Sequence, residues 1–434
     1  MKNMKKRSLR RIFAGILGIG ILLTGAAPCA AAAYGYDEYG DPIVTATPVP
    51  DSQSGQVTQA APAHSSYYSQ AADTDSIDGW PTGPNVEAQA AVLMDVNTEA
   101  VLYSKNGDTQ LYPASITKIM TTLLACENLN VKTKITVSEN ASTSVSAGDS
   151  SIYAAPGEVF TRDQALMAVM LQSANEMSVA VAEEVSGSVK KFTELMNWRA
   201  KLFGCKNTHF NNPNGLPDEN HYTTASDMAK IAKSAWLNPL FRRYCTRRYY
   251  EIPATNKFAE ARQLLNHHKM MKNGEYYYEG VLGGKTGYTD ASGNTLVTYC
   301  KRGNMTLVAV ILNSTSAANA YSDTASLFNY GFENFEKMDM KVSMEPVPFK
   351  VLPCDKYILK NNGNTYPFYY QTNVYVTVPK GTKRSQLTKR QAVLQNAAGP
   401  LRLKSKYYYQ KQMVGWGMQY ERNVVSDLLL QTSS

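Results

Sequence analysis

The sequence predicts an antiparallel β-sheet flanked by helices, an α/β (α+β) arrangement, followed by a small all-β domain. Apolar strand-like pairs stand at both ends of residues 86–335, with long helical stretches between them. Strands and helices therefore do not alternate as they would in regular βαβ units. Beyond about residue 345 the helical patterns stop, and short strand-like runs separated by Pro and Gly follow, at 348–352, 357–359, 373–378, 392–394 and 407–414.

The elements of residues 86–335 follow from apolar periodicity. A first hairpin is expected at 90–94 and 100–103, and a second strand pair at 294–300 and 305–313. The chain has 434 residues, more than one ordinary domain contains. Helices are expected where apolar residues recur at helical spacing, at 116–126, 164–184, 192–203, 225–236 and 317–330.

Residues 1–33 have the pattern of a secretory signal peptide. Basic residues precede an apolar run over 12–27, and small residues follow it. That run is shorter than the ~20 residues of a membrane-spanning helix, although an uncleaved anchor is the alternative. We therefore expect a secreted, extracytoplasmic protein. Residues 34–85, rich in Ser, Thr, Ala and Pro without an apolar period, are expected to form a disordered linker.

Positive charge is concentrated at the two ends of the chain. The six basic residues of 1–33 account for most of the formal charge, since 8 − 6 leaves +2, and this balance does not favour a nucleic-acid partner. Residues 345–422 carry thirteen Lys and Arg against three Asp and Glu, a balance of +10. We expect there a basic β-rich domain, followed by a tail at 423–434, that suits an anionic polymer or a membrane surface.

The cysteines do not predict a metal or redox site. No two of the five beyond residue 33 have the close spacing of zinc ligands or of a redox pair, so we expect buried thiols and neither metal nor cofactor. These five are Cys126, Cys205, Cys245, Cys300 and Cys354.

A first candidate motif is Ser-x-x-Lys, formed by Ser115 and Lys118. Residues three apart on a helix share a face, so the lysine amine would lie beside the serine hydroxyl. A serine nucleophile needs such a base, and burial or a second cation lowers the pKa of a lysine. Alone the motif is weak, because a capping serine beside a surface lysine gives the same letters.

The second candidate motif is Ser173-Ala174-Asn175, which interrupts an apolar stretch. Polar side chains in such a run need partners or a function. Ser173 could relay a proton from Lys118 to a leaving nitrogen, and the amide of Asn175 could hold both Lys118 and a substrate carbonyl. A polar junction between helices is the alternative.

The third candidate motif is Lys285-Thr286-Gly287, followed by Tyr288. Its small residues would let a strand edge approach a peptide backbone closely. Lys285 and Thr286 could grip a terminal carboxylate. A glycine-rich hairpin turn is the alternative for this segment.

The three motifs in this order carry the resemblance. They are the set shared by penicillin-binding proteins and β-lactamases, with Ala174 in place of the usual aspartate. With the flanking residues at 112–121 and 283–289, the chain resembles the low-molecular-mass penicillin-binding proteins of the D-alanyl-D-alanine carboxypeptidase family, peptidase family S11. The resemblance covers about 86–335 and implies the penicillin-binding-protein/β-lactamase-like transpeptidase fold.

This resemblance implies an activity. Ser115 would attack the penultimate D-alanine carbonyl of a peptidoglycan stem pentapeptide, Lys118 would accept its proton, and the backbone N–H groups of Ser115 and Tyr288 would form the oxyanion hole. β-Lactams would acylate Ser115, and the protein would work at the cell wall or the outer face of the cytoplasmic membrane. An arginine that some relatives use for the substrate carboxylate is absent, and His267 or His268 lies in that area.

Three alternatives remain open in the sequence. A DD-transpeptidase would use the same residues with an amine acceptor. A β-lactamase-like hydrolase is less favoured, because a Glu-x-x-Leu-Asn signature is absent between Ser173 and Lys285. A non-catalytic cell-wall-binding protein is disfavoured by the presence of all three motifs.

Overall fold

The computed structural model describes residues 35–36, 42–43, 64–342, 368–370, 373–394 and 402–421. Strands β1 (Gly35–Tyr36) and β2 (Pro42–Ile43) form a short antiparallel pair. The predicted signal segment and tail lie outside the described residues. None of the helices in the described ranges is both long and apolar enough to cross a bilayer.

The centre of residues 64–334 is a five-stranded antiparallel sheet in the order β4-β3-β11-β10-β9. Both predicted strand pairs are present in it. Strand β9, which carries the third motif, lies at the edge, so one side of it is open to a peptide. The strands are β3 (Ala90–Asp95), β4 (Val101–Lys105), β9 (Val281–Thr289), β10 (Gly293–Arg302) and β11 (Met305–Ser314).

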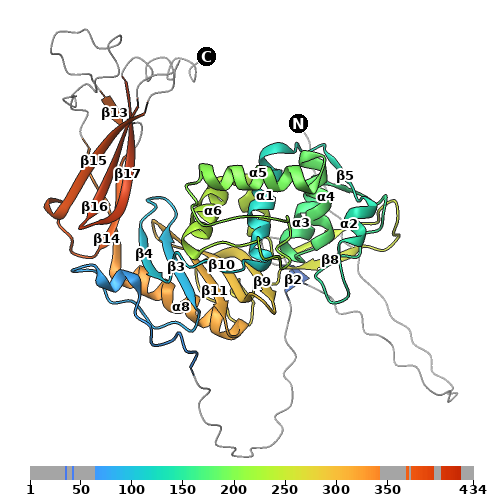
Figure 1. The fold of residues 1–434 in the computed structure, drawn as a ribbon, viewed down its shortest axis with the longest axis horizontal. Helices are drawn as coiled ribbons and strands as arrows, with labels where there is room; N and C mark the ends of the chain where they lie inside the picture. Colours follow the sequence, from blue (N-terminus) through green and yellow to red (C-terminus); the bar gives the residue numbers. More distant parts are fainter. Residues whose placement is uncertain are drawn as a thin grey trace, which may run out of the picture. The chain divides into compact units, whose positions relative to one another are not determined.

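Helices cover both faces of this sheet (Figure 1). Along β3, Val92 and Met94 pack into the cluster with α1 and α6, whereas Ala91 and Leu93 pack into the cluster with α8. A strand buried on both faces reads as a continuous apolar run, as β3 does. The helices are α1 (Lys118–Asn128), α2 (Glu139–Thr143), α3 (Arg162–Leu171), α4 (Asn175–Ser186), α5 (Val189–Leu202), α6 (Ala225–Leu237), α7 (Pro239–Cys245) and α8 (Ala317–Asn334).

The helix expected over 164–184 is two helices. Helix α3 ends at Leu171 and α4 begins at Asn175. Between them Ser173 has a φ of 58°, in the left-handed region where a helix cannot continue. The apolar composition of this stretch gives no sign of the break between α3 and α4. The second motif lies at this break.

The folded region begins earlier than the expected boundary at residue 86. Residues 64–85, which were assigned to the linker, pack against the central sheet and include the short helix η1 (Asp73–Ser76). Trp80 is buried, and its indole N–H donates a hydrogen bond to the carbonyl of Leu102 at 2.8 Å. Hydrogen bonds to the core also hold the segment, such as those from Lys105 Nζ to the Tyr67 carbonyl and from Ser104 Oγ to Asp73. A segment held by such scattered contacts shows no apolar period, which explains why the sequence predicts a linker here.

The C-terminal region is a six-stranded antiparallel sheet in the order β12-β14-β17-β16-β15, with β13 beside β17. It begins at Phe335, directly after α8, and not at 345. The run expected as one strand at 407–414 contains a turn, where Gln410 has a φ of 52°. The expected runs at 348–352 and 357–359 lie outside the described residues. The strands are β12 (Phe335–Asp339), β13 (Phe368–Tyr370), β14 (Tyr375–Pro379), β15 (Leu387–Leu394), β16 (Arg402–Tyr409) and β17 (Gln412–Glu421).

Candidate active site

Ser115 and Lys118 lie at the start of α1, as their spacing predicts. Ser115 belongs to a short 3-10 turn, Ala114–Thr117, which leads into the helix. The Nζ atom of Lys118 lies 2.9 Å from the Oγ atom of Ser115. Ala114 has a φ of 51°, which costs about 1–2 kcal/mol for an L-residue, so the surrounding structure must hold this turn in place.

Two carbonyl oxygens complete the surroundings of the Lys118 amine. Nζ lies 2.7 Å from Oδ1 of Asn175 and 2.6 Å from the backbone oxygen of Asn214. A neutral amine has two N–H donors and one lone pair. Because both carbonyls can only accept, they take the two donors, and the lone pair remains for the hydroxyl proton of Ser115.

Burial favours this neutral form of Lys118. The side chain is fully buried, and the pKa of Lys118 is held well below its ordinary value by loss of hydration and by the nearby charge of Lys285. Glu176 and Asp149 act in the opposite direction but more weakly. The arrangement therefore supplies a general base in contact with a hydroxyl nucleophile.

Ser173 and Asn175 come from the break between α3 and α4. The Oγ atom of Ser173 is buried and has no hydrogen-bond partner in the part of the chain that the structure describes. Such a hydroxyl normally has a partner, so a bound substrate is well placed to supply one. The neighbouring loop is fixed by Glu176, whose carboxylate accepts from Ser151 Oγ and from the N–H of Ile152, each at 2.8 Å.

Lys285 is the buried lysine of the third motif. The side chain is 2% exposed, and Nζ donates to the backbone oxygen of Thr286 at 2.8 Å. Burial lowers the pKa of Lys285 to about 7. Lys285 is two residues from Gly287 and therefore shares its face of β9, the face that meets Ser115, while Thr286, Gly287 and Tyr288 line the cleft. The charge of Lys285 also acts on Lys118 and lowers its pKa.

Strand β9 approaches the Ser115 backbone closely at Gly287. A Cβ atom on Gly287 would lie 2.8 Å from the Ser115 nitrogen and 2.4 Å from Oγ1 of Thr295. Thr295 in turn donates from Oγ1 to the carbonyl of Pro113 at 2.9 Å. Glycine at this position is what lets the strand edge, Ser115 and the turn before it meet.

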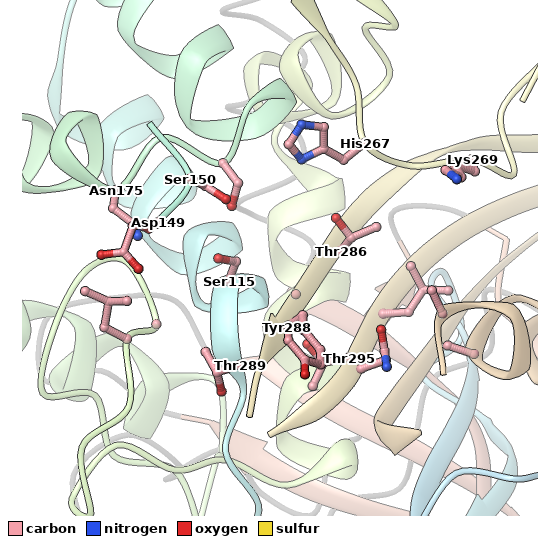
Figure 2. A pocket seen from close by; sticks show the side chains of 18 of the residues that line it. Ser115, Asp149, Ser150, Asn175, His267, Lys269, Thr286, Tyr288, Thr289 and Thr295 are labelled. Atoms are coloured by element: carbon pink, nitrogen blue, oxygen red, sulfur yellow. The ribbon is translucent and has the colours of Figure 1, made fainter. Parts of the chain in front are cut away.

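The site opens into a cleft of about 380 Å³. Figure 2 shows Ser115 between Ser150 and Asn175 on one side and Thr286 and Tyr288 of β9 on the other. His267 lines this cleft, whereas His268 is buried with its Nε2 2.8 Å from Oγ1 of Thr298. Of the two histidines, His267 alone faces a ligand.

Sequence reasoning missed several groups of the site. The carbonyl of Asn214 belongs to the backbone, so no side chain signals its part in binding Lys118. Thr295, Ser150 and Asp149 line the cleft from segments outside the three motifs. The segment Asn-Asn-Pro-Asn-Gly at 211–215 carried a partial signal. A Cβ atom on Gly215 would lie 1.9 Å from the oxygen of Ala114, and this close approach brings Asn214 to the lysine.

Known proteins are similar to this chain in sequence and fold. The D-alanyl-D-alanine carboxypeptidase family, peptidase S11, matches residues 79–316. The chain is 38% identical over 253 residues to D-alanyl-D-alanine carboxypeptidase DacF of Bacillus subtilis (strain 168), which is 58% of this chain and 63% of that protein. The aligned stretch thus spans less than two thirds of that relative.

Two solved structures show the same fold. Penicillin-binding protein 5 from Haemophilus influenzae has a TM-score of 0.63 at 26% identity, covering 79% of this chain and 98% of that chain. The Streptomyces K15 DD-transpeptidase has a TM-score of 0.55 at 30% identity, covering 58% and 100%. The expected fold is thereby confirmed, and the chain belongs to the D-alanyl-D-alanine carboxypeptidase family, peptidase S11.

Proposed function

We propose that the protein is a penicillin-binding serine D-Ala-D-Ala carboxypeptidase that removes the terminal D-alanine from peptidoglycan stem pentapeptides. The observation that carries this proposal is the Lys118 amine, which has two carbonyl acceptors and contacts the Ser115 hydroxyl. A base of this kind turns a serine into a nucleophile at neutral pH.

Acylation begins at Ser115. Its Oγ attacks the carbonyl carbon of the penultimate D-alanine while its proton moves to Nζ of Lys118. The backbone N–H groups of Ser115 and Tyr288 hold the developing oxyanion, because Gly287 lets β9 approach the Ser115 nitrogen. Preorganised donors of this kind contribute about 10²–10³ in rate each.

The departing D-alanine must receive a proton. The unpartnered hydroxyl of Ser173 lines the cleft and passes a proton from Lys118 to the leaving nitrogen. Water then hydrolyses the acyl-Ser115 ester, with Lys118 again as the base. Neither step requires a metal or a cofactor.

The terminal carboxylate binds on the β9 side of the cleft. Thr286 lines this side, and His267 and Lys269 also face the cleft. Lys285 contributes positive charge from the face of β9 that meets Ser115, and it donates a hydrogen bond to the Thr286 carbonyl. The carboxylate therefore binds at Thr286 in the field of Lys285.

A DD-transpeptidase is the second candidate, because the solved Streptomyces K15 structure carries that name and covers the catalytic region at 30% identity. The transfer reaction uses the same acyl-serine and replaces water by an amine. Both reactions share Ser115 and Lys118, so the products must decide between them.

Two assays test this function. A fluorescent penicillin should label the wild type and leave Ser115→Ala unlabelled; an unlabelled wild type, or equal labelling of Ser115→Ala, would refute an acyl-serine enzyme. Incubation with a stem pentapeptide should release free D-alanine without a cross-linked product. A cross-linked product would favour the transpeptidase.

We also propose an extracytoplasmic location, at the cell wall or the outer face of the cytoplasmic membrane, because the substrate lies there and residues 1–33 have a signal pattern. Anionic wall polymer or membrane surface is the proposed partner of the basic C-terminal domain. Loss of export after deletion of residues 1–33 would support the location, and export without them would contradict it.

A further inference from the structure

One face of the C-terminal sheet collects cations from adjacent strands. Along β16 the alternating residues Arg402, Lys404 and Lys406 point to one face, while Leu403 and Ser405 between them are buried. In register, Lys406 lies opposite Arg390 of β15 on one side and Trp416 of β17 on the other. We call these four cations, with Tyr408 and Trp416, the basic face.

The basic face itself contains no Asp or Glu, and the acids of this sheet are Glu336 and Asp339 of β12 and Glu421 at the end of β17. Residues 373–394 and 402–420 contain no Asp or Glu. Arg390 and Lys406 are direct cross-strand partners, and like charges in that position repel each other. The acid that acts on Lys404 is Glu99, which is already paired with Lys233 at 2.6 Å. The arrangement lowers the stability of the sheet unless an anion binds.

Aromatic rings hold two of the cations in place. Nζ of Lys404 lies 4.4 Å from the ring centroid of Trp416, and the guanidinium of Arg390 lies 5.0 Å from that of Tyr408. The indole N–H of Trp416 is buried without a hydrogen-bond partner among the described residues. A buried donor of this kind normally has an acceptor.

A cleft of about 330 Å³ adjoins the basic face. Its lining includes Trp416, Met418, Tyr420 and Lys337. Aromatic walls with a few polar groups suit a sugar ring. Beside it, the cations of β16 are spaced roughly 7 Å apart, since strand residues rise about 3.3 Å each. A row of cations next to a ring-sized cleft matches a linear polymer that repeats both a sugar and an anionic group.

We propose that the basic face binds an anionic wall polysaccharide, with its phosphate or carboxylate groups on the row of cations and a sugar in the Trp416 cleft. This inference rests on the proposed function, which places the enzyme at the wall. A membrane surface fits less well: the large exposed apolar side chains on described strands β14 to β17 are Tyr375 and Leu394, at 40% and 43% exposure. Insertion into a bilayer needs a broader apolar face.

The test compares charge loss on the two sides of the sheet, in the full-length chain. Arg390→Gln/Lys406→Gln removes two cations of the basic face. Lys389→Gln/Lys411→Gln is the matched control, because Lys389 lies opposite the buried Tyr407 on the other side and Lys411 lies in the exposed turn. Binding is measured by co-sedimentation with purified cell walls, before and after extraction of their anionic polysaccharide.

The wild type and the control should bind intact walls, and Arg390→Gln/Lys406→Gln should bind about tenfold more weakly, with a shallower salt dependence. Extraction of the polymer should remove the difference. Equal loss in both variants, binding unchanged by extraction, or stronger binding to phosphatidylglycerol-containing vesicles than to walls would each overturn the proposal. Penicillin labelling of the same samples reports separately on Ser115, so failure of the proposed function is distinguishable.

Discussion

The two regions of this protein place positive charge in opposite environments. In the catalytic region Lys118 and Lys285 are buried, and burial lowers the pKa of each. On the C-terminal sheet Arg390 and Lys406 are exposed on a strand pair without acids. The comparison teaches that burial decides the chemistry of a cation: a desolvated lysine becomes a base, while a hydrated one remains a receptor for anions.

The largest loss of acylation rate is expected when Lys118 is replaced by a residue that cannot lose its proton. Lys118→Arg keeps a long basic side chain in the helix, but arginine stays protonated in proteins, so the neutral base is lost. We expect the rate of acylation by penicillin to fall about 10³-fold, since a general base contributes typically 10²–10⁴. Stopped-flow or gel-based labelling measures this rate. A rate within tenfold of the wild type would show that Lys118 is not the base.

A smaller effect is expected when the neutral form of Lys118 is disfavoured. Asn175→Asp places a carboxylate where Oδ1 lies 2.7 Å from Nζ, which should raise the pKa of Lys118 by about 1–3 units. The acidic limb of the pH–acylation profile should move to higher pH, and activity at pH 7 should fall about tenfold or more. Recovery at high pH separates this effect from misfolding. An unshifted limb would contradict the role of Asn175.

Removal of the buried amine of Lys285 should increase the stability of the fold at neutral pH. Its pKa of about 7 in the folded protein lies below the ordinary value of 10.5, so the unfolded chain binds more protons between these values. Stability therefore rises with pH through that window. Lys285→Met should raise the melting temperature at pH 7, by roughly 2–4 °C per kcal/mol gained, and less so at pH 10.

The control for that measurement is Lys389→Met, an exposed lysine whose replacement should change the melting temperature little at either pH. A fall in the melting temperature of Lys285→Met at pH 7, or a gain that grows with pH, would show that the buried amine stabilises the fold. Differential scanning calorimetry at pH 7 and pH 10 measures these melting temperatures.

The smallest expected effect is the change in the free energy of unfolding when the exposed pair Arg390 and Lys406 is replaced. Arg390→Gln/Lys406→Gln removes a like-charge contact across two strands, which should raise the free energy of unfolding by a few tenths of a kcal/mol, roughly 0.2–1. Urea denaturation at low salt measures it, and added salt should diminish the gain by screening. Destabilisation by this double substitution would mean that the contact of Arg390 with the Tyr408 ring outweighs the like-charge repulsion.

The sequence predicts the site correctly where the functional side chains are only a few residues apart. Ser115 and Lys118 are three residues apart at a helix start, and the structure brings their functional atoms to 2.9 Å. Both strand pairs of the central sheet were predicted because they form long, apolar, buried runs. The expected pairing of Ser173 and Asn175 with Lys118 is met by Asn175, whose amide oxygen contacts Nζ.

Features that depend on backbone atoms or on single buried side chains could not be predicted from the sequence. The Asn214 carbonyl has no residue signature, so the second acceptor of Lys118 was missed. The left-handed Ser173 breaks a helix that composition makes continuous. The burial of Lys285 follows from the packing around β9, which a short motif does not specify. Trp80 anchors a segment whose composition resembles a linker.

The role of neutral Lys118 as the base is tested by measuring the rate of acyl-Ser115 formation as a function of pH and locating the penicillin adduct by mass spectrometry. We predict one adduct, mapped to Ser115, whose rate of formation rises through a pKa well below 10.5 and is flat above it. An adduct on a different serine, or a rate that still rises up to pH 10 as for an ordinary lysine, would contradict a neutral Lys118 as the base.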